Sequence, residues 1–323
     1  MRCIMARMPE RWLDGSKRSP DEEAEALRAL VARLAGPGFA IERALGGMST
    51  PVYRLRRDQD CLYLRMSEEP GGSMHAEVAL HGHLRGAGVA VPEVIAMDEA
   101  PEIGRGVMLV REIAGEPLAG AEGIDRTPIL RAAGRDLARI NAVAVEGFGW
   151  IRRDGPVWPL RGQDATYAAF VENGSVSIAF VAEQLGTEQE RRTLAERFDE
   201  ASADDPASRL AHGDFDATHI YQRDGRYTGV IDFGEIRGAE PYHDLAFFLV
   251  QDQAEAMLGD VIAGYAEISP LPADLSTRLR RSATVIVAKQ LCRWIERDGV
   301  ESLDRPSGRW WLERLGALLA DAP

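Results

Sequence analysis

The chain has 323 residues, of which 45% are hydrophobic and 28% charged, and its formal net charge is −13. This balance is typical of a soluble globular protein and argues against a nucleic-acid-binding protein, which needs a basic face. No apolar run approaches the roughly 18–20 residues of a membrane span, so we expect no membrane association. The three cysteines are widely spaced and show no metal-site pattern, which predicts free thiols and a cytoplasmic location.

The first third of the chain mixes helical and strand-like patterns. Residues 20–35 carry apolar side chains at helical spacing, with acidic residues in the first turn and a glycine after the last. The later elements that we predict are strands at 39–45, 52–56 and 61–66, a helix at 74–86 and an apolar strand at 107–113. We therefore predict an α+β N-terminal lobe at residues 1–113.

A break at Ala114-Gly115-Glu116-Pro117 ends this region. Helical patterns then dominate, at 127–144, 164–184, 187–200, 252–266, 271–296 and 309–320, whereas residues 147–163 are predicted to form a loop. We predict a second, mainly helical lobe at 114–323, because the chain is too long for one small core. Most of the negative charge lies in this lobe, where it can attract a cationic substrate or simply maintain solubility.

Two acidic motifs near residue 220 carry the chemistry. Asp214 lies in the turn His212-Gly213-Asp214, and Asp232 ends an apolar run that precedes Phe233-Gly234. Between them the pattern predicts two short strands around the turn Asp224-Gly225, and such a hairpin brings both carboxylates to one end. One carboxylate can then orient an attacking hydroxyl while the other holds Mg²⁺ against nucleotide phosphates, which predicts phosphoryl transfer.

With these motifs, residues 38–320 resemble the aminoglycoside phosphotransferase family, which shares the protein-kinase fold. The resemblance implies an α+β fold of two lobes, a small antiparallel-sheet N-terminal lobe and a mainly helical C-terminal lobe. It also implies Asp214 as the catalytic residue, Asp232 as a metal ligand, Mg²⁺ as cofactor and ATP or GTP as phosphoryl donor. In the family a later Asp, here Asp244, braces the catalytic loop, although its position also suits a helix N-cap.

Residues of the first lobe are implied to bind the nucleotide phosphates. Gly47, Ser49 and Thr50 lie between two candidate strands, where backbone and hydroxyl groups can bind phosphate, but the pattern also fits a plain hairpin turn. No lysine lies on the third strand, so Arg65 is the candidate phosphate-binding cation and Glu77 its partner. The alternative for Arg65 is an exposed strand residue that pairs with any nearby acid.

The strand at 107–113 has a further role that only the resemblance implies. It matches the family's linker between the lobes, whose backbone binds the purine edge, so Val110 and Ile113 are candidate base-binding residues. Its composition alone indicates no more than a buried strand.

His219 departs from the protein-kinase pattern, in which Asn stands five residues after the catalytic Asp. Magnesium prefers oxygen ligands, and imidazole is a poorer substitute. The family's macrolide kinases and aminoglycoside 2″-kinases are similar in having His at this position. We therefore keep His219 as a candidate metal-site residue that binds the ion directly, through water, or contacts phosphate instead.

Of the reaction, the nucleotide and the acceptor, the acceptor is the one that the sequence specifies least. Asp216 and Glu235 flank the catalytic motifs and are candidate contacts to a cationic small molecule, so an aminoglycoside is the predicted acceptor. The alternatives are a macrolide kinase, a metabolic kinase acting on choline, homoserine or a sugar, and a non-catalytic nucleotide-binding module. We expect a monomer or homodimer with no nucleic-acid partner.

Overall fold

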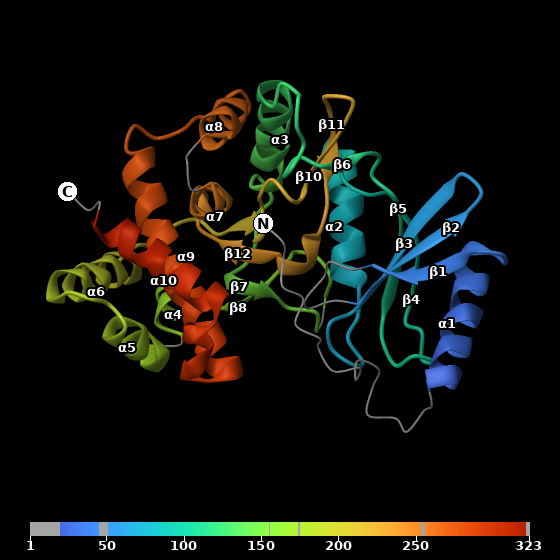
Figure 1. Cartoon of the computed structure of the whole chain (residues 1–323), viewed down its shortest axis with the longest axis horizontal. Helices are drawn as coiled ribbons and strands as arrows, with labels where there is room; N and C mark the ends of the chain where they lie inside the picture. Colours follow the sequence, from blue (N-terminus) through green and yellow to red (C-terminus); the bar gives the residue numbers. More distant parts are fainter. Residues whose placement is uncertain (1–19, 45–50, 155, 174, 253–255, 321–323) are drawn as a thin grey trace. The chain divides into compact units, whose positions relative to one another are not determined.

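The computed structural model describes residues 20–44, 51–154, 156–173, 175–252 and 256–320 (Figure 1). They divide into two compact units. One contains the described residues up to His83 together with Pro92–Glu112, and the other contains Leu84–Val91 together with the described residues from Ile113 onward. Nothing in the described part of the chain is a helix long and apolar enough to cross a membrane.

The first unit is built on one antiparallel sheet, which confirms the α+β prediction. Its five strands are ordered β1-β2-β3-β5-β4. Their bounds are Ala40–Arg43, Val52–Arg57, Asp60–Met66, Val94–Asp98 and Val107–Arg111 for β1 to β5, and the two helices are α1 (Pro20–Ala35) and α2 (His75–Gly86). The strand β4 was not predicted, because most of its side chains are only half-buried and show no clear alternation.

Side chains of this sheet alternate between two apolar clusters, as strand geometry requires. Leu64 and Leu109 pack with Leu30 and Val31 of α1 in one cluster. Met108 joins Met74 and Val78 in the other, at the start of α2. Neighbouring residues of β5 therefore face opposite sides of the sheet, and each side is covered by one helix.

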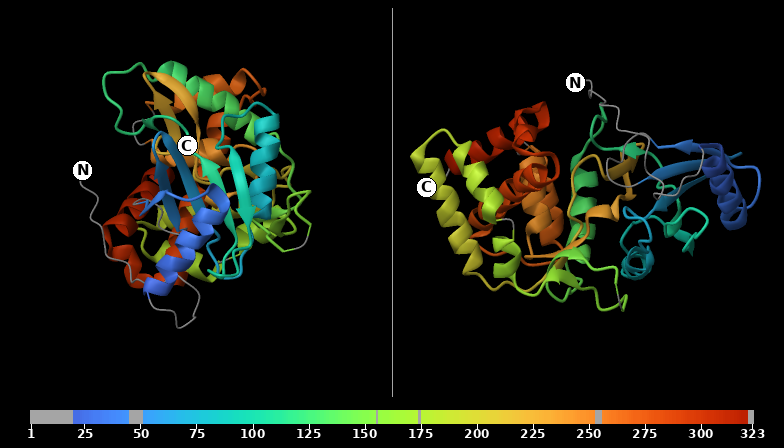
Figure 2. Two further views of the ribbon diagram at one scale, coloured as in Figure 1. Left: turned by 90° about the vertical axis from the view of Figure 1, so that its right-hand side faces the viewer. Right: turned by 90° about the horizontal axis from the view of Figure 1, so that it is seen from below.

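The second unit is mainly helical. Its α-helices are α3 (Thr127–Ile140), α4 (Tyr167–Glu172), α5 (Ser175–Glu183), α6 (Glu188–Ser202), α7 (His243–Gln251), α8 (Leu258–Ala266), α9 (Leu275–Asp298) and α10 (Pro306–Ala320). The predicted helix at 164–184 is divided into α4 and α5. Thr187 and Glu190 form a reciprocal capping box that starts α6, which is why the chain can begin a new helix there. Helices α9 and α10 lie side by side (Figures 1 and 2).

The second unit also contains two small sheets, whose strands include those directly before, between and after the two acidic motifs. One has the order β11-β10-β6 and the other β8-β7-β12-β9. Their strands are β6 (Glu116–Pro117), β7 (Phe148–Ile151), β8 (Gly162–Asp164), β9 (Arg209–Ala211), β10 (Ile220–Arg223), β11 (Arg226–Val230) and β12 (Arg237–Ala239). The segment 147–163, predicted to be a loop, thus contributes β7 and the start of β8.

The predicted hairpin between the motifs is confirmed. Strands β10 and β11 pair antiparallel from Ile220 opposite Val230 to Arg223 opposite Arg226. The two turn residues, Asp224 and Gly225, both have positive φ (52° and 71°), as a tight hairpin turn with the twist of the flanking strands requires. The hairpin therefore returns the chain from the catalytic loop before β10 to the segment after β11.

Candidate active site

The loop between β9 and β10, which carries the candidate catalytic residue Asp214 and is called the catalytic loop below, is held in place by His212. Its ring is buried, its Nε2 lies 2.9 Å from the carbonyl oxygen of Ile231, and it packs edge-on against Phe233 with ring centres 4.6 Å apart. Burial, together with the nearby charge of His219, lowers the pKa of His212 to about 4. The ring is therefore neutral at pH 7, which supports a structural role and excludes a proton shuttle that operates near neutrality.

Asp244 holds the same loop through its carboxylate. One oxygen accepts the backbone N–H of His212 and the other that of Gly213, each at 2.8 Å, and Asn141 donates its side-chain amide at 2.8 Å. Asp244 is fully buried in the first turn of α7 and does not act as its N-cap, which is Tyr242. The bracing role that the resemblance implied is therefore what the contacts show, and the N-cap alternative was wrong.

Gly213 is required by the shape of the loop. Its φ is +84°, and a Cβ at this position would lie 2.1 Å from the carbonyl oxygen of Glu235 and 2.8 Å from Nε of Arg237. No side chain fits in that space, and the positive φ disfavours other residues in any case. The catalytic loop and the segment after Asp232 therefore pack backbone against backbone.

Asp214 follows this glycine and keeps 36% of its side chain exposed. Burial of the remainder raises its pKa to about 6; the positive charge of His219 opposes this rise, while the carboxylates of Asp216, Glu235 and Asp232 add to it. A carboxylate with this pKa is mostly ionised at pH 7 but is a stronger base than an ordinary aspartate. It can therefore receive a proton from a hydroxyl group that lies within hydrogen-bond distance of it.

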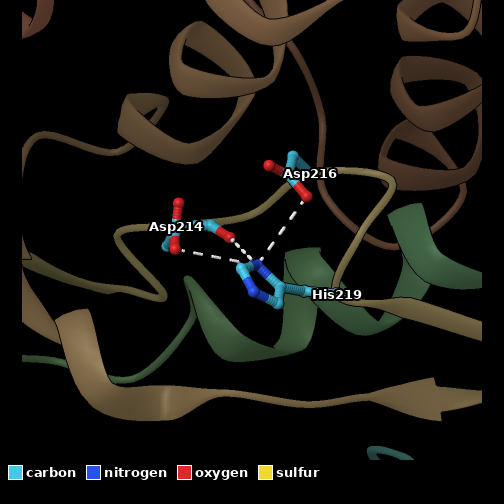
Figure 3. Close-up of side chains that lie close together, drawn as sticks. All are labelled: Asp214, Asp216 and His219. Carbon is cyan, nitrogen blue, oxygen red and sulfur yellow. Dashed lines mark hydrogen bonds and ion pairs between the residues drawn. The ribbon is translucent and has the colours of Figure 1, made fainter. Parts of the chain in front are cut away.

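His219 lies between the acidic side chains (Figure 3). Its Nδ1 is 2.7 Å from the backbone oxygen of Asp214, 3.8 Å from the carboxylate of the same residue and 3.7 Å from that of Asp216. A carbonyl oxygen can only accept, so Nδ1 carries the hydrogen and donates it. Burial lowers the pKa of His219, but Asp214, Asp216 and Asp232 together raise it above its ordinary value.

The other ring nitrogen of His219 faces Asp232. The distance from Nε2 to the carboxylate of Asp232 is 3.8 Å, and 41% of the Asp232 side chain is exposed. Two ligands of one ion, each roughly 2.0–2.2 Å from it, can span this distance. The pair therefore fits a divalent cation in separation and charge, although the imidazole suits magnesium less well than a second oxygen ligand would.

Asp232 also has a strained backbone. Its φ and ψ are 66° and 65°, in the left-handed region, directly before the short 3₁₀ helix Phe233–Glu235. Such a conformation costs a non-glycine residue on the order of 1 kcal/mol or more and is found disproportionately at functional sites. The backbone thus turns sharply where the side chain must face His219.

The two candidate acceptor carboxylates already have partners within the protein. Asp216 accepts hydrogen bonds from the backbone N–H and the hydroxyl group of Thr218. Glu235 accepts from Arg237 at 2.8 Å and from Arg293 at 3.2 Å. Both side chains lie near Asp214, as predicted, and in each carboxylate these hydrogen bonds go to a single oxygen, Oδ1 of Asp216 and Oε2 of Glu235.

The other predicted site residues lie on other elements of the chain. Arg65 lies on β3 with 9% exposure, so it is not the solvent-exposed strand arginine of the alternative interpretation, and Glu77 of α2 is also buried. Val110 is buried in β5, and the Ile113 side chain comes close to Gly229. Three candidates, Gly47, Ser49 and Thr50, lie outside the described residues.

Sequence reasoning missed several residues that shape the site. Asn141, at the C-terminal end of α3, donates to Asp244 and to the backbone oxygen of Leu210. Arg237 and Arg293 donate to Glu235, and both pack over Trp150, so three different elements meet there. None of them lies in a local motif, so only the fold brings them to the catalytic loop.

Comparison with known proteins identifies the class. Residues 40–280 match the phosphotransferase enzyme family, and the chain belongs to this family. It is accordingly a phosphotransferase, and its predicted resemblance to aminoglycoside phosphotransferases is confirmed by the solved structures to which it is similar. Among curated proteins, no sequence matches the chain.

Three solved structures illustrate the likeness. Aminoglycoside phosphotransferase APH(4)-Ia is 18% identical with a TM-score of 0.67, covering 93% of this chain and 100% of that one. A thermostable mutant of it, in a ternary complex with ADP and hygromycin B, is 17% identical with a TM-score of 0.65, covering 90% and 97%. The GDP complex of aminoglycoside 2′-phosphotransferase-IIIa is 18% identical with a TM-score of 0.65, covering 93% and 99%. At these identities the likeness establishes the fold.

Proposed function

We propose that this phosphotransferase moves the γ-phosphoryl group of a nucleoside triphosphate to a hydroxyl group of a small molecule, with Asp214 as its catalytic residue. The observation that carries the proposal is the position of Asp214, partly exposed on a loop that Asp244 and His212 hold in place, with His219 between it and Asp232. Membership of the phosphotransferase family supports the reaction class.

In this proposal Asp214 accepts a hydrogen bond from the acceptor hydroxyl and aligns its oxygen with the γ-phosphorus. Phosphoryl transfer has a loose transition state that requires positioning more than basicity, so the proton moves to the carboxylate late. The raised pKa of Asp214, about 6, suits a residue that is ionised before the transfer and protonated after it.

We assign the metal site to Asp232 and His219. Asp232 offers a carboxylate oxygen, and the unprotonated Nε2 of His219 offers the second ligand, because Nδ1 donates to the backbone of Asp214. A bound Mg²⁺ would neutralise the charge of the β- and γ-phosphates. The His219 ring would also hold the two carboxylates at a fixed separation.

The nucleotide, ATP or GTP, is assigned to the first 113 residues. Arg65 with Glu77 is proposed to bind its phosphates, Gly47, Ser49 and Thr50 to approach them, and Val110 and Ile113 to lie at the base. The solved neighbours with ADP and GDP support a nucleotide donor. Such a donor and the free thiols of Cys61 and Cys292 favour the cytoplasm as the place of reaction.

Two classes of acceptor have support. The net charge of −13 and the hygromycin B complex of a solved neighbour favour a cationic aminoglycoside. The pairing of Glu235 with two arginines favours a second class, a hydroxylated metabolite that carries an acidic group. A macrolide, which the sequence also left open, has no further support from the described contacts.

The test of the proposed function is acceptor-dependent formation of ADP or GDP. The purified protein would be assayed with a panel of aminoglycosides, macrolides, choline, sugars and hydroxy acids. Asp214→Asn should reduce turnover by about 10²–10⁴-fold and leave nucleotide binding intact. The control Asp224→Asn changes an exposed hairpin carboxylate and should be neutral. Full turnover in Asp214→Asn would exclude the catalytic role.

A further inference from the structure

A cluster of two arginines and one tryptophan adjoins the catalytic loop and has no part in the steps above. Trp150 of β7 stands directly opposite Arg237 of β12 in the antiparallel register. The guanidinium carbon of Arg237 lies 4.3 Å from the centre of a Trp150 ring, and that of Arg293, from α9, lies 4.8 Å from it. Both cations are thus held against one indole, an arrangement that restricts their motion.

The charges in this cluster do not cancel. The Glu235 carboxylate accepts from Nη2 of Arg237 at 2.8 Å and from Nη1 of Arg293 at 3.2 Å, so one negative charge serves two guanidinium groups. Arginine remains protonated in proteins even when buried, so the two arginines and Glu235 by themselves carry one net positive charge, while Asp244 and Asp214 also act on Arg237. Arg237 is largely covered, whereas 41% of the Arg293 side chain is exposed. Arg293 is therefore the cation of the cluster that a ligand can reach from solvent.

Arg293 also has hydrogen-bond donors to spare. Among the residues that the structure describes, its hydrogen-bond acceptor is Glu235, which uses Nη1. The Nε and Nη2 groups are therefore available, and a guanidinium binds carboxylate and phosphate through two parallel hydrogen bonds. A side chain already ordered by Trp150 and Glu235 loses little conformational entropy when it binds such a group.

The cluster is next to the reacting centre. Arg237 Nε is 2.8 Å from the position that a Cβ of Gly213 would occupy, directly before Asp214. Glu235, which links the two arginines, is close enough to Asp214 to act on it electrostatically. A group attached a few bonds from a hydroxyl at Asp214 could therefore reach Arg293.

We propose that Arg293, ordered by Trp150 and Glu235, binds a carboxylate or phosphate group on the acceptor, and that the acceptor is a hydroxylated acid. This inference rests on the proposed phosphoryl transfer and chooses between its two acceptor classes. Arg293 sets specificity by charge, while the Glu235 carboxylate, which accepts from two guanidinium groups through Oε2, attracts the amino groups of an aminoglycoside less than an unpaired carboxylate would.

The test uses pairs of hydroxylated probes that differ only in a carboxylate or an aminomethyl group: gluconate against glucamine, and glycerate against 3-amino-1,2-propanediol. Their binding to the full-length protein is measured by calorimetry or ligand-observed NMR with Mg²⁺ and a non-hydrolysable ATP analogue present. In at least one pair the acid should bind about 10-fold more tightly than the amine, and Arg293→Gln should remove that preference. Arg297→Gln, on an exposed arginine one turn along α9 that pairs with Asp298, should keep it.

The outcomes separate the proposals. If no acid binds more tightly than its amine partner, or if Arg293→Gln keeps the preference, the acceptor role of Arg293 is overturned. If Arg293→Gln instead weakens the binding of the ATP analogue and leaves the preference for the acidic probe unchanged, the arginine binds a nucleotide phosphate. The acceptor role is then again overturned. Because no transfer occurs in these measurements, they are independent of the Asp214→Asn turnover assay that tests the reaction itself.

Discussion

The carboxylate of Asp244 accepts the backbone N–H of Gly213 at 2.8 Å, so a residue of α7 fixes the backbone that presents Asp214. The other carboxylate oxygen accepts from His212 and Asn141. The three donors stabilise this fully buried carboxylate, which has no direct ion pair with any residue that the structure describes. The catalytic loop is therefore held in place by a residue that need not touch any substrate.

Asp244→Asn should impair both stability and turnover. An Asn amide offers one acceptor oxygen in place of two, so at least one buried N–H of the loop is left unpaired, at a cost of about 1–3 kcal/mol. We expect a lower urea midpoint and a lower kcat, with nucleotide affinity little changed. Asp205→Asn, on an exposed residue, is the control. A variant of Asp244 with a wild-type midpoint and kcat would contradict the bracing role.

The pH dependence of turnover should report Asp214. Its pKa is raised to about 6, and the protonated form cannot accept the hydroxyl proton, so kcat/KM should fall about tenfold per unit below pH 6 and level off above it. In the metal-free protein the positive charge of His219 lowers the pKa of Asp214, so NMR titration without metal should find a higher Asp214 pKa in His219→Asn than in the wild type. The measurement of turnover is kcat/KM, which reports the pKa of the free enzyme. A limb near the ordinary aspartate pKa would contradict this assignment.

The raised pKa of Asp214 also means that its charged form lowers the stability of the folded protein. A carboxyl group whose pKa is raised in the folded state above its value of 3.8 destabilises the fold above both pKa values and is neutral below both. Asp214→Asn should therefore unfold at a higher temperature than the wild type at pH 7, and this gain should shrink as the pH falls from about 6 to about 4. Calorimetry across this range tests the sign. An Asn variant less stable at pH 7 would argue against burial as the cause.

Comparing Gly213→Ala with Gly88→Ala separates the cost of a steric clash at Cβ from the cost of a positive φ. Gly213 has φ +84° and its Cβ would collide with the backbone of Glu235, whereas Gly88 has φ +79° and no atom within 4 Å of its Cβ position. Gly88→Ala should therefore cost only the backbone strain, about 1–2 kcal/mol. Gly213→Ala should cost clearly more and abolish turnover, as measured by urea unfolding and initial rates. Equal costs at the two positions would show that the collision is relieved.

Elements that depend on residues close together in the sequence could be predicted, whereas elements that depend on distant residues could not. The hairpin around Asp224-Gly225 and the first-unit strands predicted at 52–56 and 61–66 are encoded by local patterns, and these predictions were confirmed, with one more residue at one end of each strand. The strand β7 was missed because its four residues include a glycine and show no alternation, and its pairing to β12 involves residues nearly ninety positions away. Short strands of this kind are stabilised by their partners, which a local pattern does not contain.

The same reasoning applies to the site. Asp214, His219 and Asp232 lie on the segments that flank one hairpin, so their proximity follows from a local prediction. The hydrogen bond from Arg293 to Glu235 could not be predicted. Arg293 lies on a helix that begins forty residues later, and only the tertiary fold brings it to Glu235. A motif thus indicates which groups react, whereas the charge that surrounds the acceptor depends on contacts between distant elements.

The crossing of α3 and α8 offers a test of packing away from the site. A Cβ on Gly134 would lie 2.1 Å from the carbonyl oxygen of Val261, and one on Gly264 would lie 2.0 Å from that of Arg131. Replacing glycine by alanine inside a helix normally stabilises it by about 1 kcal/mol, and Gly259→Ala in α8, with no atom within 4 Å of its Cβ position, should show this gain.

Gly134→Ala and Gly264→Ala should have the opposite sign, because the backbones of the two helices must separate to admit the methyl group. We expect each to cost about 1–3 kcal/mol of unfolding free energy in urea titrations. Since both glycines line one crossing, the double variant should cost less than the sum of the single ones, as the first separation already makes room for the second methyl group. Full additivity would mean that the two contacts relax independently and that the helices do not move apart as a unit.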